Sequence, residues 1–142
     1  MEGVMRSEAH PHSVARDPAQ RAYQLLHWGL VLVPMVAGVD KFFQWLTDWD
    51  QYLAPAVERA LPFSAQTFMR ITGVAELCAA VIVAVWPRIG GYVVAAWLTG
   101  IVVDLLLARG WYDIVLRDVG LIVAALALSW LAKAYDRKEV RR

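Results

Sequence analysis

Four long apolar stretches dominate the chain, and polar connectors separate them. A helix needs about 20 apolar residues to cross the hydrocarbon core of a bilayer. The stretches of suitable length are residues 23–46, 67–86, 91–108 and 112–135. We therefore predict an all-α integral membrane protein, an antiparallel bundle of four transmembrane helices within a domain of residues 23–135.

Two of the connectors are very short. Residues 87–90 separate the second stretch from the third, and Arg109 and Gly110 separate the third from the fourth. Connectors of this length make consecutive helices antiparallel neighbours. Gly90 and Gly110 stand where the end of a helix favours a left-handed residue. Pro34 lies inside the first stretch and should kink that helix without ending it.

The connection over residues 47–66 is longer and has a pattern of its own. Its start, Thr47-Asp48-Trp49-Asp50, resembles a capping box. Apolar residues then recur on one helical face, at Trp49, Leu53, Val57 and Leu61. This pattern predicts a short amphipathic helix, either an interfacial connector on the membrane surface or a lid over the bundle.

The distribution of lysine and arginine predicts the orientation, because cytoplasmic loops carry more of both. If both termini are cytoplasmic, the outer loops hold only Arg59 and Arg109. The inner side then holds nine basic residues: Arg6, Arg16, Arg21, Arg88, Lys133, Arg137, Lys138, Arg141 and Arg142. We expect a multi-pass protein of the bacterial cytoplasmic membrane with a disordered cytoplasmic tail at 1–22 and a basic cytoplasmic tail at 136–142.

Composition narrows the function classes. Hydrophobic residues make up 59% of the chain, above the usual 45–50% of soluble domains. The formal net charge of +1 argues against nucleic-acid binding. Cys78 is the single cysteine, so an intrachain disulfide is excluded, and we expect it to be a small buried apolar residue. Residues 1–22 lack the features of a cleaved signal peptide.

Ionisable residues inside the apolar stretches are the strongest indication of a site. A charge in hydrocarbon costs at least about 2.5–3.5 kcal/mol, so such residues are paired, hydrated or functional. The predicted threading brings seven of them between the outer interface and mid-membrane: Asp40, Lys41, Arg70, Glu76, Asp104, Arg117 and Asp118.

Helical phase divides these seven residues into two groups. Small residues mark helix contact faces, and Gly38, Gly73, Gly100 and Gly120 share faces with Lys41, Glu76, Asp104 and Arg117, respectively. Those four charged residues should point into the bundle, with Asp40, Arg70 and Asp118 flanking them. They form either structural ion pairs or an outward-facing polar pocket for a small ligand, a quinone head group or a proton.

Conventional cofactor motifs are not evident in the sequence. His27 is the only histidine in a predicted span, which excludes a bis-histidine haem within the chain, and we expect it to lie at the interface. Gly-rich phosphate loops and nucleophile motifs are not found either, and no metal site is predicted. The catalytic residues, if any exist, are not identified.

The order of several short motifs resembles the DoxX-like superfamily of small four-helix bacterial membrane proteins. The motifs are Gly38-Val39-Asp40-Lys41-Phe42, then Arg70-Ile71-Thr72-Gly73-Val74-Ala75-Glu76-Leu77, then Trp86-Pro87-Arg88, and finally Arg117-Asp118-Val119-Gly120-Leu121. The resemblance covers about residues 23 to 135. It implies a four-helix membrane bundle, links to quinone-coupled sulfur oxidation and oxidative stress, and a polar signature at Lys41, Glu76, Arg117 and Asp118.

Three functions follow as hypotheses. The first is a DoxX-like membrane subunit of a quinone-linked redox system, whose pocket binds a quinone or relays its protons while a partner subunit carries the redox centres. The second is a non-catalytic structural or assembly subunit of a larger membrane complex or homo-oligomer. The third is a small-solute or proton permease, which ranks lower because the polar residues stop near mid-membrane and no transporter-like repeat is evident. An accessory role is favoured over a stand-alone enzyme.

Overall fold

The computed structural model describes residues 18–139, and this part contains helices and no strand. The long helices are α1 (Pro18–Phe43), α3 (Ala65–Val85), α4 (Pro87–Ala108) and α5 (Tyr112–Glu139). The 3-10 helix η1 (Trp49–Tyr52) and the short helix α2 (Pro55–Ala60) lie between α1 and α3. All four long helices are apolar enough to span a membrane, which confirms the predicted fold class.

The first helix begins and ends earlier than expected. It begins at Pro18, so residues 18–22 of the predicted tail are helical; residues 1–17 and 140–142 lie outside the described part. It continues through Pro34, as predicted, and ends at Phe43 because Gln44 has a left-handed φ of 52°. At the other terminus, α5 extends beyond Tyr135 to Glu139.

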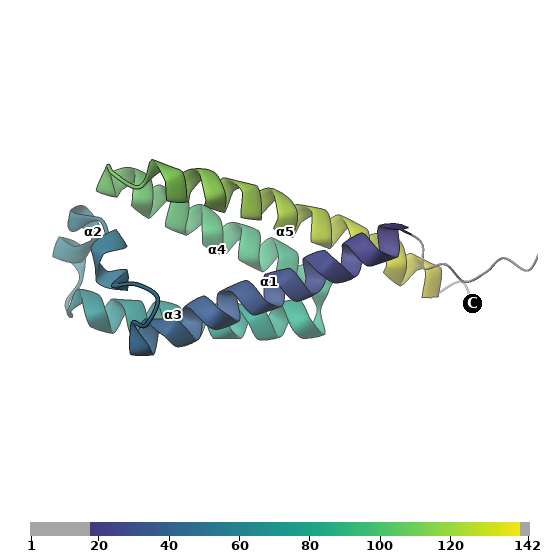
Figure 1. Cartoon of the computed structure of the whole chain (residues 1–142), viewed down its shortest axis with the longest axis horizontal. Helices are drawn as coiled ribbons and strands as arrows, with labels where there is room; N and C mark the ends of the chain where they lie inside the picture. The colour runs from purple at the N-terminus through teal and green to yellow at the C-terminus, as the bar shows by residue number, and fades with distance from the viewer. Residues whose placement is uncertain (1–17, 140–142) are drawn as a thin grey trace, which may run out of the picture.

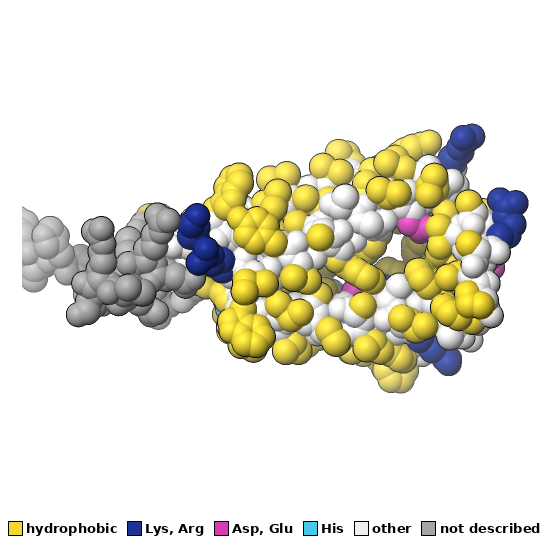
Figure 2. Space-filling model, turned by 180° about the vertical axis from the view of Figure 1, so that it is seen from behind, with side chains coloured by type: hydrophobic (Ala, Val, Ile, Leu, Met, Phe, Trp, Pro, Cys, Tyr) yellow, Lys and Arg dark blue, Asp and Glu magenta, His cyan; other side chains and the backbone are white. Residues whose placement is uncertain are grey.

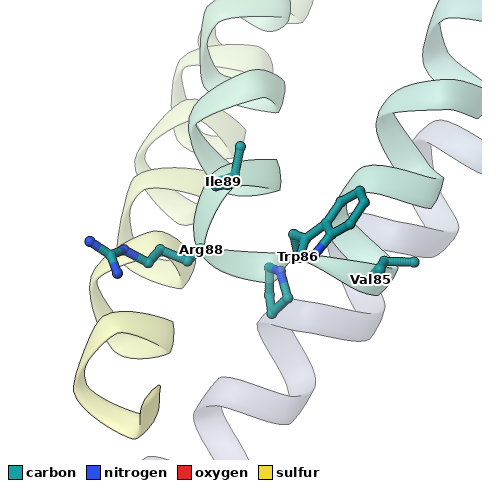
Figure 3. A pocket seen from close by; sticks show the side chains of 5 residues that line it. Val85, Trp86, Arg88 and Ile89 are labelled. Atoms are coloured by element: carbon teal, nitrogen blue, oxygen red, sulfur yellow. The ribbon is translucent and has the colours of Figure 1, made fainter. Parts of the chain in front are cut away.

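The short turns differ from the prediction in a way that Pro87 explains. Proline disfavours a helical residue before it but fits the first helical position. Trp86 therefore has a non-helical backbone (φ −130°, ψ 72°), and α4 begins at Pro87, which places Gly90 inside the helix. After α4, Arg109 rather than Gly110 adopts the left-handed conformation (φ 53°). Figure 3 shows Trp86 and Arg88 pointing in different directions around the α3–α4 turn. A surface hollow of about 270 Å³ lies at this turn, and no acidic residue lines it.

The long helices form two pairs, α1 with α3 and α4 with α5 (Figure 1). The pairs meet at the end where the described chain begins and finishes, which we call the termini end. They diverge toward η1 and α2 at the opposite end. We call residues 49–60 the cap and this second end the cap end.

Glycines explain where the helices approach closely. A Cβ atom added to Gly38 would lie 2.8 Å from the Gly73 carbonyl oxygen, so these two glycines let α1 and α3 touch, as the sequence predicts. Near the termini end, a Cβ on Gly90 would collide with the Val83 backbone of α3. A Cβ on Gly91 would collide with Ala125 and Ser129 of α5. Consecutive glycines therefore hold α4 against both neighbours at this end.

The predicted contact faces of the last two helices are wrong. A Cβ on Gly100 or on Gly120 would have no neighbour within 4 Å. The tight contact between α4 and α5 uses Gly91 instead, one short turn after Pro87. The empty space beside Gly100 is consistent with the divergence of the two pairs toward the cap end.

A packed apolar core fills the junction of the two pairs at the termini end. It includes Leu30, Val31, Val83, Val94 and Leu128, all buried. His27 adds a polar contact there, since its Nε2 lies 3.0 Å from the Val83 carbonyl oxygen, to which only an N–H can donate. His27 thus joins α1 to α3, close to the C-cap of α3 at Trp86.

Large apolar side chains cover the outward faces of the helices. Leu25, Val81, Leu116 and Val123 are more than half exposed, which suits contact with lipid rather than water. Cys78 is exposed as well, so the prediction that it is buried is wrong.

The glycine contact gives a direct test of helix packing. Gly38→Ala should lower the free energy of unfolding by about 1–3 kcal/mol, because the new methyl group overpacks the crossing of α1 and α3. Gly29→Ala is the matched control in the same helix. Its Cβ meets nothing within 4 Å, so better helix propensity should stabilise the protein by up to about 1 kcal/mol. Detergent unfolding titrations measure both; shifts of the same sign would contradict the packing.

Candidate functional site

A cavity of about 920 Å³ lies between the two helix pairs toward the cap end. All four long helices and the cap line it, mostly with apolar side chains. The four residues predicted to point into the bundle, Lys41, Glu76, Asp104 and Arg117, all contribute to its wall. Figure 2 shows a hollow on the face formed by α3 and α4, with acidic side chains inside it and apolar side chains around its rim.

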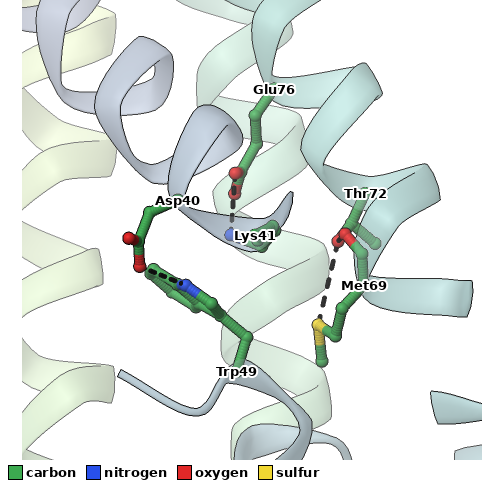
Figure 4. Close-up of polar contacts among 6 residues, drawn as sticks. All are labelled: Asp40, Lys41, Trp49, Met69, Thr72 and Glu76. Atoms are coloured by element: carbon green, nitrogen blue, oxygen red, sulfur yellow. Dashed lines mark hydrogen bonds and ion pairs between the residues drawn. The ribbon is translucent and has the colours of Figure 1, made fainter. Parts of the chain in front are cut away.

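The central polar feature of the cavity wall is a buried ion pair between α1 and α3. Lys41 Nζ lies 2.7 Å from Glu76 Oε2, and the two side chains are 6% and 8% exposed. The ammonium group also lies 3.7 Å from the centre of the Trp49 ring in the cap, as a cation–π contact. Figure 4 shows Lys41 between Glu76 and Trp49. Each charge therefore has the partner that burial requires.

Asp40 neighbours Lys41 in sequence but has a different task. Its carboxylate accepts hydrogen bonds from the backbone N–H groups of Trp45 (2.9 Å) and Leu46 (3.1 Å) and from Trp49 Nε1 (2.8 Å; Figure 4). Asp40 is buried but does not line the cavity. The Asp40 carboxylate thus closes the end of α1 and fixes the start of the cap. It is not part of the cavity wall that it was predicted to flank.

Asp104 connects the second helix pair to the cap. Its Oδ1 accepts a hydrogen bond from the Ala54 backbone N–H at 3.2 Å, and Ala54 and Leu53 are buried. Because Pro55 follows, Ala54 is extended and begins α2. The single amphipathic helix expected here is therefore split into η1 and α2. Trp49, Tyr52 and Val57 of the cap line the cavity, which is the arrangement expected of a lid.

Arg117 and Asp118 exchange the positions that the sequence predicts. Arg117 Nε lies 3.0 Å from Asp118 Oδ1, but the Arg117 side chain is 63% exposed whereas Asp118 is 4% exposed. Arg117 thus lies at the rim of the cavity, and Asp118, predicted to flank it, is the buried partner. Arg70 is exposed and does not line the cavity.

Trp97 is the cavity residue that the charge pattern missed. Its Nε1 is buried and has no hydrogen-bond partner of good geometry in the described part of the chain, although it lies beside the Glu76 carboxylate. A buried donor that lacks a well-aligned acceptor loses free energy, so the indole N–H would gain from an acceptor placed beside Glu76. Nearby, the Thr72 hydroxyl donates to the Met69 carbonyl at 2.8 Å. The sequence did offer one indication of this residue, because Trp97 lies in the middle of an apolar stretch.

Asp50 of the cap is a partly buried carboxylate with other carboxylates nearby. Asp48 rather than Thr47 is the N-cap of η1, accepting from the Asp50 N–H at 3.1 Å. Burial raises the pKa of Asp50, the nearby carboxylates of Asp48 and Glu58 raise it further, and Arg70 opposes them. Asp50 Oδ1 is buried without a hydrogen bond among the described residues.

Comparisons with known proteins do not add a family. No protein-family model, curated protein or solved structure matches this chain. Among the described residues, no group of three His, Cys, Asp or Glu residues could hold a metal ion. The chemistry available at the cavity is therefore an ion pair, a rim guanidinium, an indole donor and a carboxylate that anchors the cap.

The ion pair can be tested by a double-mutant cycle. Lys41→Met should lower the free energy of unfolding by about 3–5 kcal/mol, because it leaves the Glu76 charge buried and unpaired. Adding Glu76→Leu should recover much of that loss. Unfolding titrations of the two single variants and the double variant measure the coupling energy. If the double variant loses as much free energy of unfolding as the two single variants added together, the two side chains are not coupled.

The cap should respond to pH through Asp50. The folded protein binds the Asp50 proton more tightly than the unfolded chain does, so stability is gained in acid. This contribution is full below the ordinary pKa of 3.8 and is lost as pH rises through the raised value. Hydrogen-exchange protection factors of the cap should therefore fall from acid toward neutral pH. Asp50→Asn should flatten this dependence, whereas Asp113→Asn, an exposed substitution at the start of α5, should preserve it.

Proposed function

We propose that the chain is a DoxX-like, non-catalytic membrane subunit of a quinone-linked redox system, with the cavity holding the quinone head group. The observation that carries this proposal is the buried Trp97 indole N–H, which has no well-aligned acceptor among the described residues, beside the Lys41–Glu76 pair in a mostly apolar cavity. Ligand sites of about 300–1,000 Å³ with few placed polar groups are typical of small-molecule binding.

The polar groups suit a ligand with acceptor oxygens. A quinone carbonyl has lone pairs but no proton to donate, so it needs donors. Trp97 Nε1 offers one N–H, and the Lys41 ammonium carries three, of which one is directed at Glu76. A protonated Glu76 would donate its proton to the quinone when the quinone is reduced, and the Glu76 carboxylate would accept a proton from the quinol when it is oxidised. The electrons would be exchanged with redox centres of a partner subunit.

The orientation of the cavity is part of this proposal. The excess of lysine and arginine near the termini favours a cytoplasmic termini end in a bacterial inner membrane, so that the cap and cavity face outward. The packed core between the pairs at the termini end, together with the His27–Val83 contact, argues against a solute or proton path to that side.

A second candidate is a structural or assembly subunit of a membrane complex. The internal pairing of the charges favours it, because Lys41–Glu76 and Arg117–Asp118 each satisfy one another and Asp40 is saturated by the cap. In that case substitutions at the pair would reduce folding and complex yield together, without a separate loss of ligand.

The two candidates differ in what Trp97→Phe does. This change keeps the aromatic ring and removes only the N–H, so the fold and partner recovery should persist. If the indole donates to a quinone, the loss of one hydrogen bond should raise the Kd about five- to tenfold. Trp130→Phe is the control, because Trp130 is exposed and does not line the cavity.

Mass spectrometry of quinones that co-purify with protein extracted in mild detergent measures this outcome. Retention by wild type and Trp130→Phe, with loss from folded Trp97→Phe and Glu76→Gln, supports the quinone site. No quinone in wild type, together with misfolding or partner loss in Glu76→Gln, would support the structural role instead.

A further inference from the structure

The cavity opens on the long side of the molecule. In Figure 2 the hollow lies on the long side of the molecule, on the face of α3 and α4, rather than at its tip. If the helices cross a bilayer, this side faces lipid. Two exposed apolar residues of α4, Val103 (52% exposed) and Leu107 (55% exposed), line the cavity and so belong to this lipid-facing rim.

A stripe of α4 leads from the rim into the cavity. Ala96, Gly100, Val103 and Leu107 all line it, and their spacings of four, three and four residues put them on one helical face. Trp97, whose buried indole N–H lies beside the Glu76 carboxylate, precedes Gly100 by about one helical turn. Gly100 thus lies between the proposed head-group site and the lipid.

The small side chains on this stripe leave room instead of admitting another helix. A Cβ on Gly38, Gly73, Gly90 or Gly91 would press on a neighbouring helix, but a Cβ on Gly100 would meet nothing within 4 Å. The opening beside Gly100 is therefore space for something other than this chain.

The lining of that space selects what can fill it. Water needs two to four polar partners at a buried site. Along this face of α4 the polar lining side chain is Asp104, whose carboxylate already accepts the Ala54 N–H, and the four residues of the stripe offer no polar side chain. Hydrocarbon needs no hydrogen bonds and is already present at the lipid-facing rim. The occupant that matches the stripe is an alkyl or isoprenoid chain.

We propose that the cavity takes a tailed ligand from the lipid phase between α3 and α4, with its chain lying across Gly100 and out past Val103. The identity of the head group as a quinone rests on the proposed function; the chain site rests on the shape and lining of the cavity. Gly100 then sets the selectivity for tailed over tailless ligands.

The test compares two ligands on three proteins in one detergent. The ligands are a benzoquinone without a tail and the same benzoquinone with a decyl chain. The proteins are wild type, Gly100→Leu and Gly120→Leu. Gly120 is the matched control, because its Cβ also meets nothing within 4 Å but it does not line the cavity. Both changes raise helix propensity alike, and melting temperatures verify folding.

Gly100→Leu should weaken binding of the decyl quinone about tenfold or more, equivalent to losing 1.4 kcal/mol or more. Tailless binding should persist, and Gly120→Leu should match wild type with both ligands. Val103→Phe, a second variant at the rim, should reproduce the selective loss. Equal binding of the decyl quinone to Gly100→Leu and Gly120→Leu would overturn the chain site, as would equal losses of both ligands in Gly100→Leu.

Failure of the head-group proposal gives a different result. If wild type binds neither quinone, native mass spectrometry of retained phospholipid replaces the quinone readout. If wild type and Gly120→Leu retain the lipid and Gly100→Leu loses it, the result supports a chain site for an acyl lipid. It then rejects only the proposal that the head group is a quinone. Equal lipid retention by all three proteins overturns the chain site.

Discussion

The close approach of α4 to its neighbours at Gly90 and Gly91 determines the shape of the rest of the bundle. Apolar helix surfaces gain little by leaving lipid for one another, so membrane helices associate through close backbone packing and polar contacts. Gly90 admits the Val83 backbone and Gly91 admits Ala125 and Ser129, all near the termini end. With no such glycine contact between the pairs farther along, the helices diverge, and the cavity follows from that divergence.

Toward the cap end, where the two helix pairs diverge, polar contacts connect the helices and the cap. The Lys41–Glu76 pair joins α1 to α3, Asp40 ties the end of α1 to the cap, and Asp104 ties α4 to the same cap through Ala54. The cap thus bridges the two helix pairs at the end where they diverge. Burying charge in hydrocarbon is costly, and here several of the charges hold together the part of the fold that apolar packing leaves open.

This division of tasks allows the same residues to serve structure and binding. Lys41–Glu76 and Arg117–Asp118 are ion pairs, so most of the charge on the cavity wall is neutralised, and Asp104 accepts the Ala54 N–H. The indole N–H of Trp97 adds a neutral donor. A neutral, lipid-soluble ligand is better suited to such a wall than an ion. The carboxylate of Glu76 remains within reach of a bound molecule, so that proton exchange and packing are compatible at one site.

The sequence by itself determined the four helices, the tight α1–α3 crossing at Gly38 and Gly73, and the set of charges that reach the cavity wall. These follow from the length and periodicity of apolar residues and from the small volume of glycine, which are local properties. It misjudged the turn at Pro87, where a local preference of proline was overlooked. It also misjudged the exposure of Arg117 and Cys78 and missed the buried N–H of Trp97 beside Glu76. Only the tertiary structure decided these last features, because they depend on how the helices are placed against one another and where they leave space. Gly91 and Gly100 look alike in the sequence, but only the first faces a helix.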